Sequence, residues 1–337
     1  MVKVTNRMIV SFVIILAIIG GAIWGITTLF NKNNKEADVV TTIFPIYDVC
    51  RTIMGDDSNV VYLEDNGVDL HSYQPTSADI NTISKSKLFI YIGGESDDWA
   101  TATLASANNA ELQTLELLQV IVDQGRGIDE STADPNRYAI NDEEEGEEGE
   151  IEYDEHIWLS IVNMIYITNA INDQLCAIYP DKAEEYTENT TAYVAELQTL
   201  NQAYETTIGN SSETETKNNT LVVADRFPFR YLVSDYNLNY YSVFSGCSAE
   251  TEASFSQLGM IITKTNDLDV DYLLQLETSN GQIADTVIKN SNDTNRSKLI
   301  INSIQSTTTT QAQNTSYIQL MQSNLLTLQT ALGYTPV

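Results

Sequence analysis

Two histidines, His71 and His156, carry the only imidazole groups in this chain of 337 residues. His71 follows a short apolar run, and His156 lies between an acidic segment and the start of a predicted helix. In open α/β sheets, ligands bind on the loops that follow the carboxyl ends of the strands. Neutral imidazole binds zinc and related metals, and carboxylates complete such sites. Either histidine alone could be purely structural, but the pair in a carboxylate-rich chain indicates a metal site.

The charge balance favours cations as partners. The chain has 47 Asp and Glu residues against 17 Lys and Arg, for a formal net charge of −30. Such a chain repels polyphosphate and has no basic stripe, which excludes nucleic-acid binding. No GxxxxGK[ST] motif occurs, so we expect no ATP hydrolysis. The 42% hydrophobic share is enough for folded cores.

The three cysteines are an unpromising source of metal ligands. Cys50, Cys176 and Cys247 lie far apart, and no CxxC motif is present. A thiolate metal site is therefore not expected, and the odd count permits either one disulfide with a free thiol or three buried thiols.

The elements that must position the histidines follow a strand–helix alternation. Short apolar runs are bounded by turn residues and separated by stretches long enough for a helix, which is typical of βαβ units and parallel sheets. These runs are residues 39–43, 60–63, 88–92, 221–224, 240–244, 272–276 and 299–301. Residues 181–208 and 316–332 have helical periodicity. The predicted fold is α/β: two lobes, each with a small parallel sheet flanked by helices, joined by one long helix.

The N-terminus predicts a membrane location. Residues 8–30 are uncharged and long enough to cross a bilayer, and Lys3 and Arg7 precede them. We expect an N-terminal transmembrane helix with the bulk of the chain extracellular at the cell membrane. A cleaved signal peptide and a buried core helix are the alternatives.

These features divide the chain into four parts. Residues 1–37 form the anchor and tether, 38–180 the N-terminal lobe, 181–208 the linking helix, and 209–337 the C-terminal lobe. The N-terminal lobe includes a loop over about residues 124–155, whose E/D/G run cannot bury apolar surface. We expect this loop to be disordered, either as a spacer or as a weak collector of cations.

Several segments together resemble the zinc/manganese solute-binding proteins of ABC transporters. Residues 67–76, G-V-D-L-H-S-Y-Q-P-T, are similar to the first ligand motif of that family, and residues 154–159, D-E-H-I-W-L, to the second, usually D-P-H-x-W-L. The opening segment 42–48 and the closing segment 317–324 also fit, so the resemblance runs from about Val39 to Leu332. It implies two four-stranded lobes with one divalent metal ion between them, held on one side by His71 and His156.

The second half departs from the family pattern at both of its ligand positions. The third ligand position, read from the F-x-Y spacing, holds Arg226, which cannot bind a cation, so the adjacent Asp225 is the preferred ligand. The fourth position, usually Asp, holds Asn302, whose neutral oxygen should bind more weakly unless this ligand has been lost. Glu252 is expected at a helix start or in the cleft wall, and the role of Glu250 is open.

The resemblance implies a receptor that captures zinc or manganese and delivers it to an ABC permease driven by a separate ATPase. Two imidazoles, a carboxylate and an amide suit either metal. We therefore expect no enzyme activity. One alternative is a zinc-dependent hydrolase with Glu155 as its base, although no H-E-x-x-H motif occurs. The other is a metal-free surface or adhesive protein with a degenerate site, as Arg226 and Asn302 suggest.

Residues 93–99 are assigned to the cleft wall.

Overall fold

The computed structural model describes residues 37–55, 59–65, 67, 70–107, 109–130, 152–209, 216–244 and 253–334. The predicted membrane segment at residues 8–30, the centre of the acidic loop, and Cys247, Glu250 and Glu252 lie outside these residues. Within the described ranges, no helix is both long enough and apolar enough to cross a membrane.

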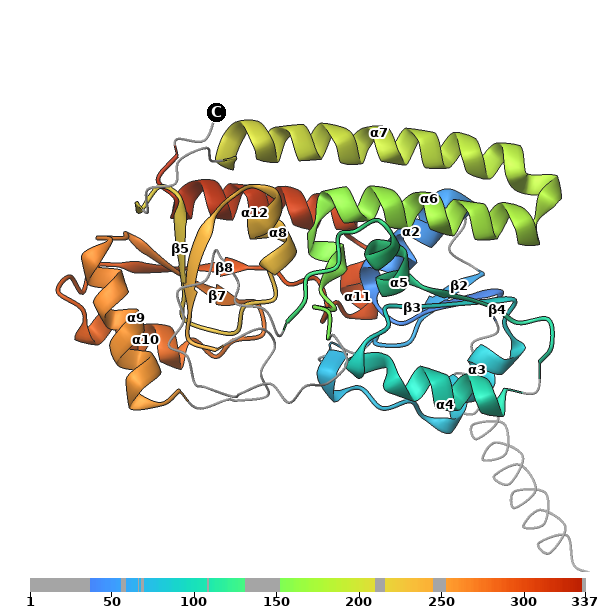
Figure 1. Cartoon of the computed structure of the whole chain (residues 1–337), viewed down its shortest axis with the longest axis horizontal. Coiled ribbons are helices and arrows are strands. Elements are labelled where there is room, and N and C mark those ends of the chain that lie inside the picture. Colours follow the sequence, from blue (N-terminus) through green and yellow to red (C-terminus); the bar gives the residue numbers. More distant parts are fainter. Residues whose placement is uncertain are drawn as a thin grey trace, which may run out of the picture.

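The first lobe is built on a parallel sheet in the order β2-β1-β3-β4. Its strands are β1 (Val39–Thr41), β2 (Val60–Tyr62), β3 (Leu88–Tyr91) and β4 (Gln113–Glu116). The flanking helices are α2 (Phe44–Met54), α3 (Ser77–Lys85), α4 (Asp98–Ser106) and α5 (Leu117–Asp123), with α3 and α4 on the opposite side of the sheet from α2 and α5 (Figure 1). Because successive strand side chains point to opposite faces, Val39 and Leu88 join the main core, whereas Val40 and Phe89 pack with α3 and α4.

The second lobe repeats this architecture in the order β6-β5-β7-β8. Its strands are β5 (Thr220–Val223), β6 (Asn239–Ser242), β7 (Tyr272–Leu276) and β8 (Ser297–Ile301). Its helices are α8 (Arg230–Asp235), α9 (Phe255–Asp267) and α10 (Gln282–Asn290). In both sheets the chain order reverses beside the first strand, where open α/β sheets bind ligands.

A layer of helices covers both lobes along one side (Figure 1). It contains α6 (Ile161–Ile178), α7 (Ala183–Ile208) and α12 (Tyr317–Ala331), and the short α11 (Thr309–Ala312) precedes α12. At 1.5 Å per residue, α7 is about 39 Å long, and it packs on α6 and α2 as well as on α12. Its buried residues recur every three or four positions and therefore form one face: Tyr186, Thr190, Tyr193, Leu197, Leu200, Tyr204 and Ile208.

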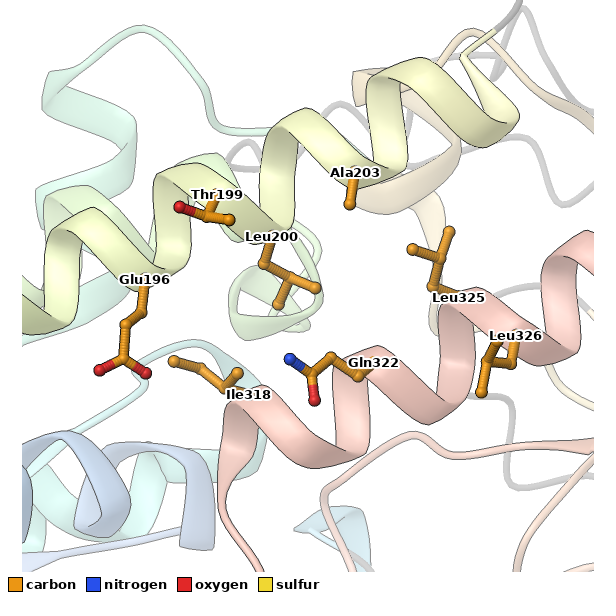
Figure 2. A pocket seen from close by; sticks show the side chains of 8 residues that line it. All are labelled: Glu196, Thr199, Leu200, Ala203, Ile318, Gln322, Leu325 and Leu326. Atoms are coloured by element: carbon orange, nitrogen blue, oxygen red, sulfur yellow. The ribbon is translucent and has the colours of Figure 1, made fainter. Parts of the chain in front are cut away.

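A pocket of about 400 Å³ opens between α7 and α12 (Figure 2). It is lined by Glu196, Thr199, Leu200, Ala203, Ile318, Gln322, Leu325 and Leu326. Neither histidine lines this pocket, so it is separate from the candidate metal site.

The two-lobed α/β fold predicted from the sequence is confirmed, including the seven predicted strands, most of them slightly shorter than expected. The strand that sequence analysis missed is β4, because its residues Gln113–Glu116 are largely exposed at the sheet edge and form no apolar run. The linking helix was expected from residue 181, but Pro180–Lys182 form a 3-10 turn before α7. The predicted C-terminal helix is α12, with Ser316 as its N-cap.

The prediction of a disordered loop over residues 124–155 is wrong at both of its described ends. Asp129 pairs with Tyr153 in an antiparallel bridge, and the amide of Asp154 donates to the carbonyl of Ile128 at 2.8 Å. The apolar side chains of Ile128 and Tyr153 pack against the core and so anchor the two ends. The acidic composition hid these few apolar residues.

The C-terminal segment returns to the first lobe. Arg51 of α2 donates to the carbonyls of Ala312 and Thr315 at 2.8 and 2.7 Å. Asp48, which is buried, accepts a hydrogen bond from the amide of Tyr317 at 2.7 Å and pairs with Arg51. The start of α12 is therefore held by side chains of α2.

Candidate metal centre

His71 lies in a 3-10 turn, Leu70–Ser72, between β2 and α3. The turn is fixed on one side by the buried side chain of Leu70 and followed by α3, which begins with a capping box of Thr76 and Asp79. The His71 side chain is 27% exposed, and its Nδ1 lies 2.7 Å from the hydroxyl of Ser96, in the loop after β3. One ring nitrogen is thus held by the protein while part of the side chain remains exposed to solvent.

His156 lies at the start of another 3-10 turn, Ile157–Leu159, and is buried. Its Nδ1 is 2.9 Å from Oδ1 of Asp154, which also accepts from the backbone amide of His156 at 2.8 Å. The His156 ring packs 5.2 Å from the buried Trp158, whose indole N–H donates to the carbonyl of Ser303 at 2.9 Å. This turn therefore contacts the loop after β8 of the second lobe.

The structure brings the two imidazoles together. Their ring centroids are 5.4 Å apart, with an angle of 49° between the ring planes. In metal-binding histidines whose Nδ1 is held by a protein partner, Nε2 is the nitrogen that coordinates the ion. Neither the spacing in sequence nor the composition requires this proximity; the fold produces it.

Two adjacent carboxylates, Asp154 and Glu155, lie beside the histidines. The Glu155 side chain is buried, and its Oε1 accepts the amide of Ser96 at 2.8 Å. Burial raises the pKa of Glu155, and the bonds from Ser96 partly offset that effect. Oε2 of Glu155 and Oδ2 of Asp154 have no hydrogen-bond partner among the described residues.

The loop after β3, which sequence analysis assigned to the cleft wall, supports this arrangement. Asp97 is buried and its Oδ2 accepts the amides of Ile92 and Gly93 at 2.8 and 3.2 Å. Burial, against those two hydrogen bonds, raises the pKa of Asp97 to about 7. Gly94 has a φ of +80°, and a Cβ there would lie 2.5 Å from Oε1 of Glu155. The close approach of this loop to Glu155 thus requires glycine.

Asp225 lies where the second-lobe sheet ends after β5. Its Oδ1 accepts the amide of Arg226 at 2.9 Å and its Oδ2 the amide of Leu276 at 3.3 Å. Within the described residues, no three His, Cys, Asp or Glu side chains converge closely enough to hold a metal. The structure therefore does not bring Asp225 into coordination range of the histidine pair.

Asn302 follows β8, and its side-chain oxygen already has a partner. Oδ1 accepts the amide of Ile304 at 2.7 Å, and Ile304 has a φ of +63°. The backbone of Asn302 is bonded on both sides by the amide group of Asn324. In this state Asn302 stabilises a tight turn.

Sequence analysis missed two residues of the second lobe near these positions. Glu277 is the first residue after β7, and its carboxylate accepts the amide and hydroxyl of Ser303 at 2.9 and 2.6 Å. Burial raises the pKa of Glu277, and the charge of Asp225 adds to the effect. Gln305 is buried, and its side-chain oxygen has no hydrogen-bond partner among the described residues. An acidic residue directly after a predicted strand could have identified Glu277; no sequence signal distinguishes Gln305.

The fold and the paired imidazoles define a class: two-lobed solute-binding proteins with a candidate metal site where the loops of both lobes meet. The model of the family "Zinc-uptake complex component A periplasmic" (ZnuA) matches residues 39–331, and the chain belongs to this family of ABC transporter solute-binding proteins. Because its members bind and carry metal ions and are not enzymes, the chain is not an enzyme, and the hydrolase alternative is excluded.

Individual relatives agree with this assignment. The chain is 27% identical to the zinc-binding lipoprotein AdcA of Streptococcus pneumoniae strain R6 over 88% of its own length, but it spans only 57% of that protein. It is 26% identical to the high-affinity zinc uptake system protein ZnuA of Bacillus subtilis, covering 90% of this chain and 89% of the relative. The crystal structure of the Zn(II)-bound ZnuA-like domain of S. pneumoniae AdcA is similar, with a TM-score of 0.65, 25% identity and coverage of 88% and 99%.

Proposed function

We propose that this protein is an extracellular receptor that binds one zinc ion between its lobes and delivers it to an ABC permease driven by a separate ATPase. The observation that carries the proposal is the convergence of His71 and His156, with Nδ1 of each ring held by a side chain of the protein. Zinc is preferred over manganese because two imidazoles suit the softer ion. The names of the relatives, which are zinc-binding proteins, support the same choice.

The remaining donors are proposed to come from the second lobe. Asp225 is the anionic ligand expected from sequence, and Asn302 the neutral one. Gln305 is an additional donor candidate, because its buried side-chain oxygen has no partner among the described residues. The segment that carries it contacts the first lobe on both sides, through Trp158 at Ser303 and through the Tyr62 hydroxyl at the carbonyl of Thr307.

Capture is proposed to occur by a small closure of the lobes. The histidine pair belongs to the first lobe, and no third His, Cys, Asp or Glu side chain of the described chain completes the site. An ion bound to the rings would be stabilised further when second-lobe oxygens reach it, so that zinc favours the closed form. Delivery then requires that the permease favour the open form. Residues 8–30 are proposed to anchor the receptor to the cell membrane.

The test is a calorimetric titration of the full-length chain with zinc and with manganese at neutral pH. We expect tight binding of one zinc ion, weaker binding of manganese, and loss of tight binding in His71→Ala and in His156→Ala. Ser106→Ala is the matched control, because the Ser106 hydroxyl bonds only within its own helix among the contacts of the described residues. Unchanged zinc affinity in both histidine variants would contradict the proposed site.

The pH dependence gives a second readout. A ligand imidazole must be neutral, so protons compete with zinc once the pH falls toward the ordinary histidine pKa of about 6.5. We expect zinc affinity to be full at pH 7.5 and to fall progressively below about pH 6. A profile that is flat between pH 7.5 and pH 5 would argue against imidazole ligands.

The second candidate is a surface or adhesive protein that has the fold and no longer binds metal. It is favoured by Arg226 at the third ligand position and by the engagement of the Asn302 oxygen with Ile304. A flat zinc titration of the wild-type chain would support it, and tight binding would eliminate it.

A further inference from the structure

The second histidine motif of this chain contains a glutamate where the family motif usually has proline. This residue, Glu155, is 7% exposed, and its carboxylate reaches the loop after β3 rather than solvent. There its Oε1 accepts the backbone amide of Ser96 at 2.8 Å, which brings the carboxylate to the residue whose hydroxyl contacts His71. Gly94, with a φ of +80°, leaves the space that the carboxylate occupies. The residue that departs from the motif is therefore tied into the site.

The same serine holds the other histidine. Its hydroxyl oxygen is 2.7 Å from Nδ1 of His71, and Oε2 of Glu155 is 4.0 Å from that nitrogen. We propose that Ser96 and Glu155 are positioning residues that together fix the orientation and tautomer of His71, so that its Nε2 faces the metal. This proposal rests on the proposed function only in taking His71 as a zinc ligand.

The direction of the hydrogen bonds follows from the donors available. An ionised carboxylate only accepts, and a serine hydroxyl has a single proton to donate. When the hydroxyl donates to Glu155, it accepts from His71, and the proton of the neutral ring then resides on Nδ1. The lone pair on Nε2 is left for the metal. His71 is thus oriented by a carboxylate through one intervening hydroxyl.

His156 is also oriented with its ring proton on Nδ1, but its carboxylate partner contacts the ring directly, with no hydroxyl between them. Asp154 accepts directly from Nδ1 of His156 at 2.9 Å. Two consecutive carboxylates therefore determine the orientation of both rings: Asp154 acts directly on His156, and Glu155 acts through Ser96 on His71. Such partners of metal-binding histidines fix the tautomer and raise the basicity of the ligand. With proline at position 155, this indirect contact to His71 would have no carboxylate.

The test uses the full-length chain with histidine that carries ¹⁵N in the imidazole ring only, so that the rings of the two histidines give all the signals. In the metal-free wild-type protein at pH 8, we expect both rings to carry their proton on Nδ1. Ser96→Ala and Glu155→Pro should move His71 toward the Nε2-protonated form and leave His156 unchanged. Ser96→Thr keeps a hydroxyl and should restore the wild-type spectrum of His71. Asp154→Asn is the converse control, because it should affect His156 alone.

Zinc affinity is measured on the same variants by competition with a chelator. We expect Ser96→Ala and Glu155→Pro to weaken zinc binding by roughly 10- to 100-fold, and Ser96→Thr by about twofold or less. An unchanged His71 tautomer in both Ser96→Ala and Glu155→Pro would overturn the proposal. So would a shifted tautomer with unchanged zinc affinity. If the wild-type chain does not bind zinc, the proposed function fails, and the tautomer measurement still decides the orienting role of Ser96.

Discussion

Individual side chains decide what this site can bind, and the histidine pair could be found from the sequence because histidine is so rare in the chain. The residues that contact the two histidines could not be found in this way. Ser96 and Gln305 belong to residue types that are common in any loop, and their roles depend on contacts between segments that are distant in sequence. Asp225 and Asn302 were identified through the family pattern, and their coordination of a metal remains a prediction.

A comparison of Asn302 with Gln305 tests which of the two supplies the neutral oxygen. Asn302→Asp and Gln305→Glu each replace an amide by a carboxylate of the same shape. Because the Asn302 oxygen is engaged with the amide of Ile304 whereas the Gln305 oxygen has no partner among the described residues, we expect Gln305→Glu to strengthen zinc binding more, by roughly tenfold. The sequence alone favoured position 302. A larger gain in Asn302→Asp, measured by chelator competition, would restore that preference.

Asp97 gives a prediction for stability. The folded protein raises the pKa of this group to about 7 from a reference value of 3.8. The folded state therefore keeps a proton that the unfolded chain releases, and the free energy of unfolding contributed by this group falls as pH rises from about 4 to 7. Asp97→Asn keeps an acceptor for the amides of Ile92 and Gly93 without a titrating charge.

We compare the free energy of unfolding of Asp97→Asn with that of the wild-type chain at pH 5 and at pH 8. The difference in favour of the variant should increase by roughly 2–3 kcal/mol from the lower to the higher pH. Urea unfolding at the two pH values measures this difference. Parallel pH dependences of the two proteins would contradict the assignment of the shift to Asp97.

At the level of elements, the sequence predicted a strand wherever a run of apolar residues marked one, including β8, which is largely exposed. It failed at β4, an exposed edge strand, and at the ends of the acidic loop, where single apolar residues pack within a charged context. The loop after β3 shows why the site could not be fully predicted. Its contacts depend on a backbone conformation at Gly94 that places Ser96 next to both Glu155 and His71.

Gly94 and Gly125 form a matched pair for testing that loop. Both have positive φ, +80° and +68°, but a Cβ would meet the Glu155 carboxylate at Gly94 and nothing within 4 Å at Gly125. Gly125→Ala should therefore cost only the backbone strain, about 1 kcal/mol. Gly94→Ala should cost about 1–3 kcal/mol and also weaken zinc binding, because Glu155 must move. Equal effects of the two changes on stability and affinity would show that the close approach of Gly94 to Glu155 is unimportant.

At the level of the whole molecule, the lobes are joined close to the candidate site by α8. Arg126 of the first lobe pairs with Asp235 of α8 at 2.5 Å, and the hydroxyl of Ser160 donates to the same carboxylate. The Tyr231 hydroxyl, on the same helix, donates to the carbonyl of Asp154 at 2.9 Å. Since α8 follows the loop that carries Asp225, these contacts link a proposed ligand of one lobe to the residue that orients His156.

Removal of the Asp235 charge should therefore affect both stability and metal release. The Asp235 side chain is 9% exposed, so Asp235→Asn removes the charge that pairs with Arg126 and should cost roughly 1–3 kcal/mol. It should also speed zinc dissociation, because closure loses a fixed contact. Glu185→Gln is the control: Glu185 pairs with Lys182 in solvent at 49% exposure, and its loss should cost less than about 1 kcal/mol. Thermal unfolding and stopped-flow chelation measure the two effects, and equal results for the two variants would exclude the role given to Asp235.

The return of the C-terminal segment to α2 has a consequence for biogenesis. Asp48 and Arg51 are made early in synthesis, yet their partners at Ala312, Thr315 and Tyr317 follow more than 260 positions later. In a polypeptide made in its N-to-C order, Arg51 can pair with Oδ1 of Asp48 at once, but Oδ2 receives the amide of Tyr317 only 269 positions later. The contacts of α2 in the first lobe are consequently complete only after the second lobe has been synthesised, even though most residues of the first lobe are made before it.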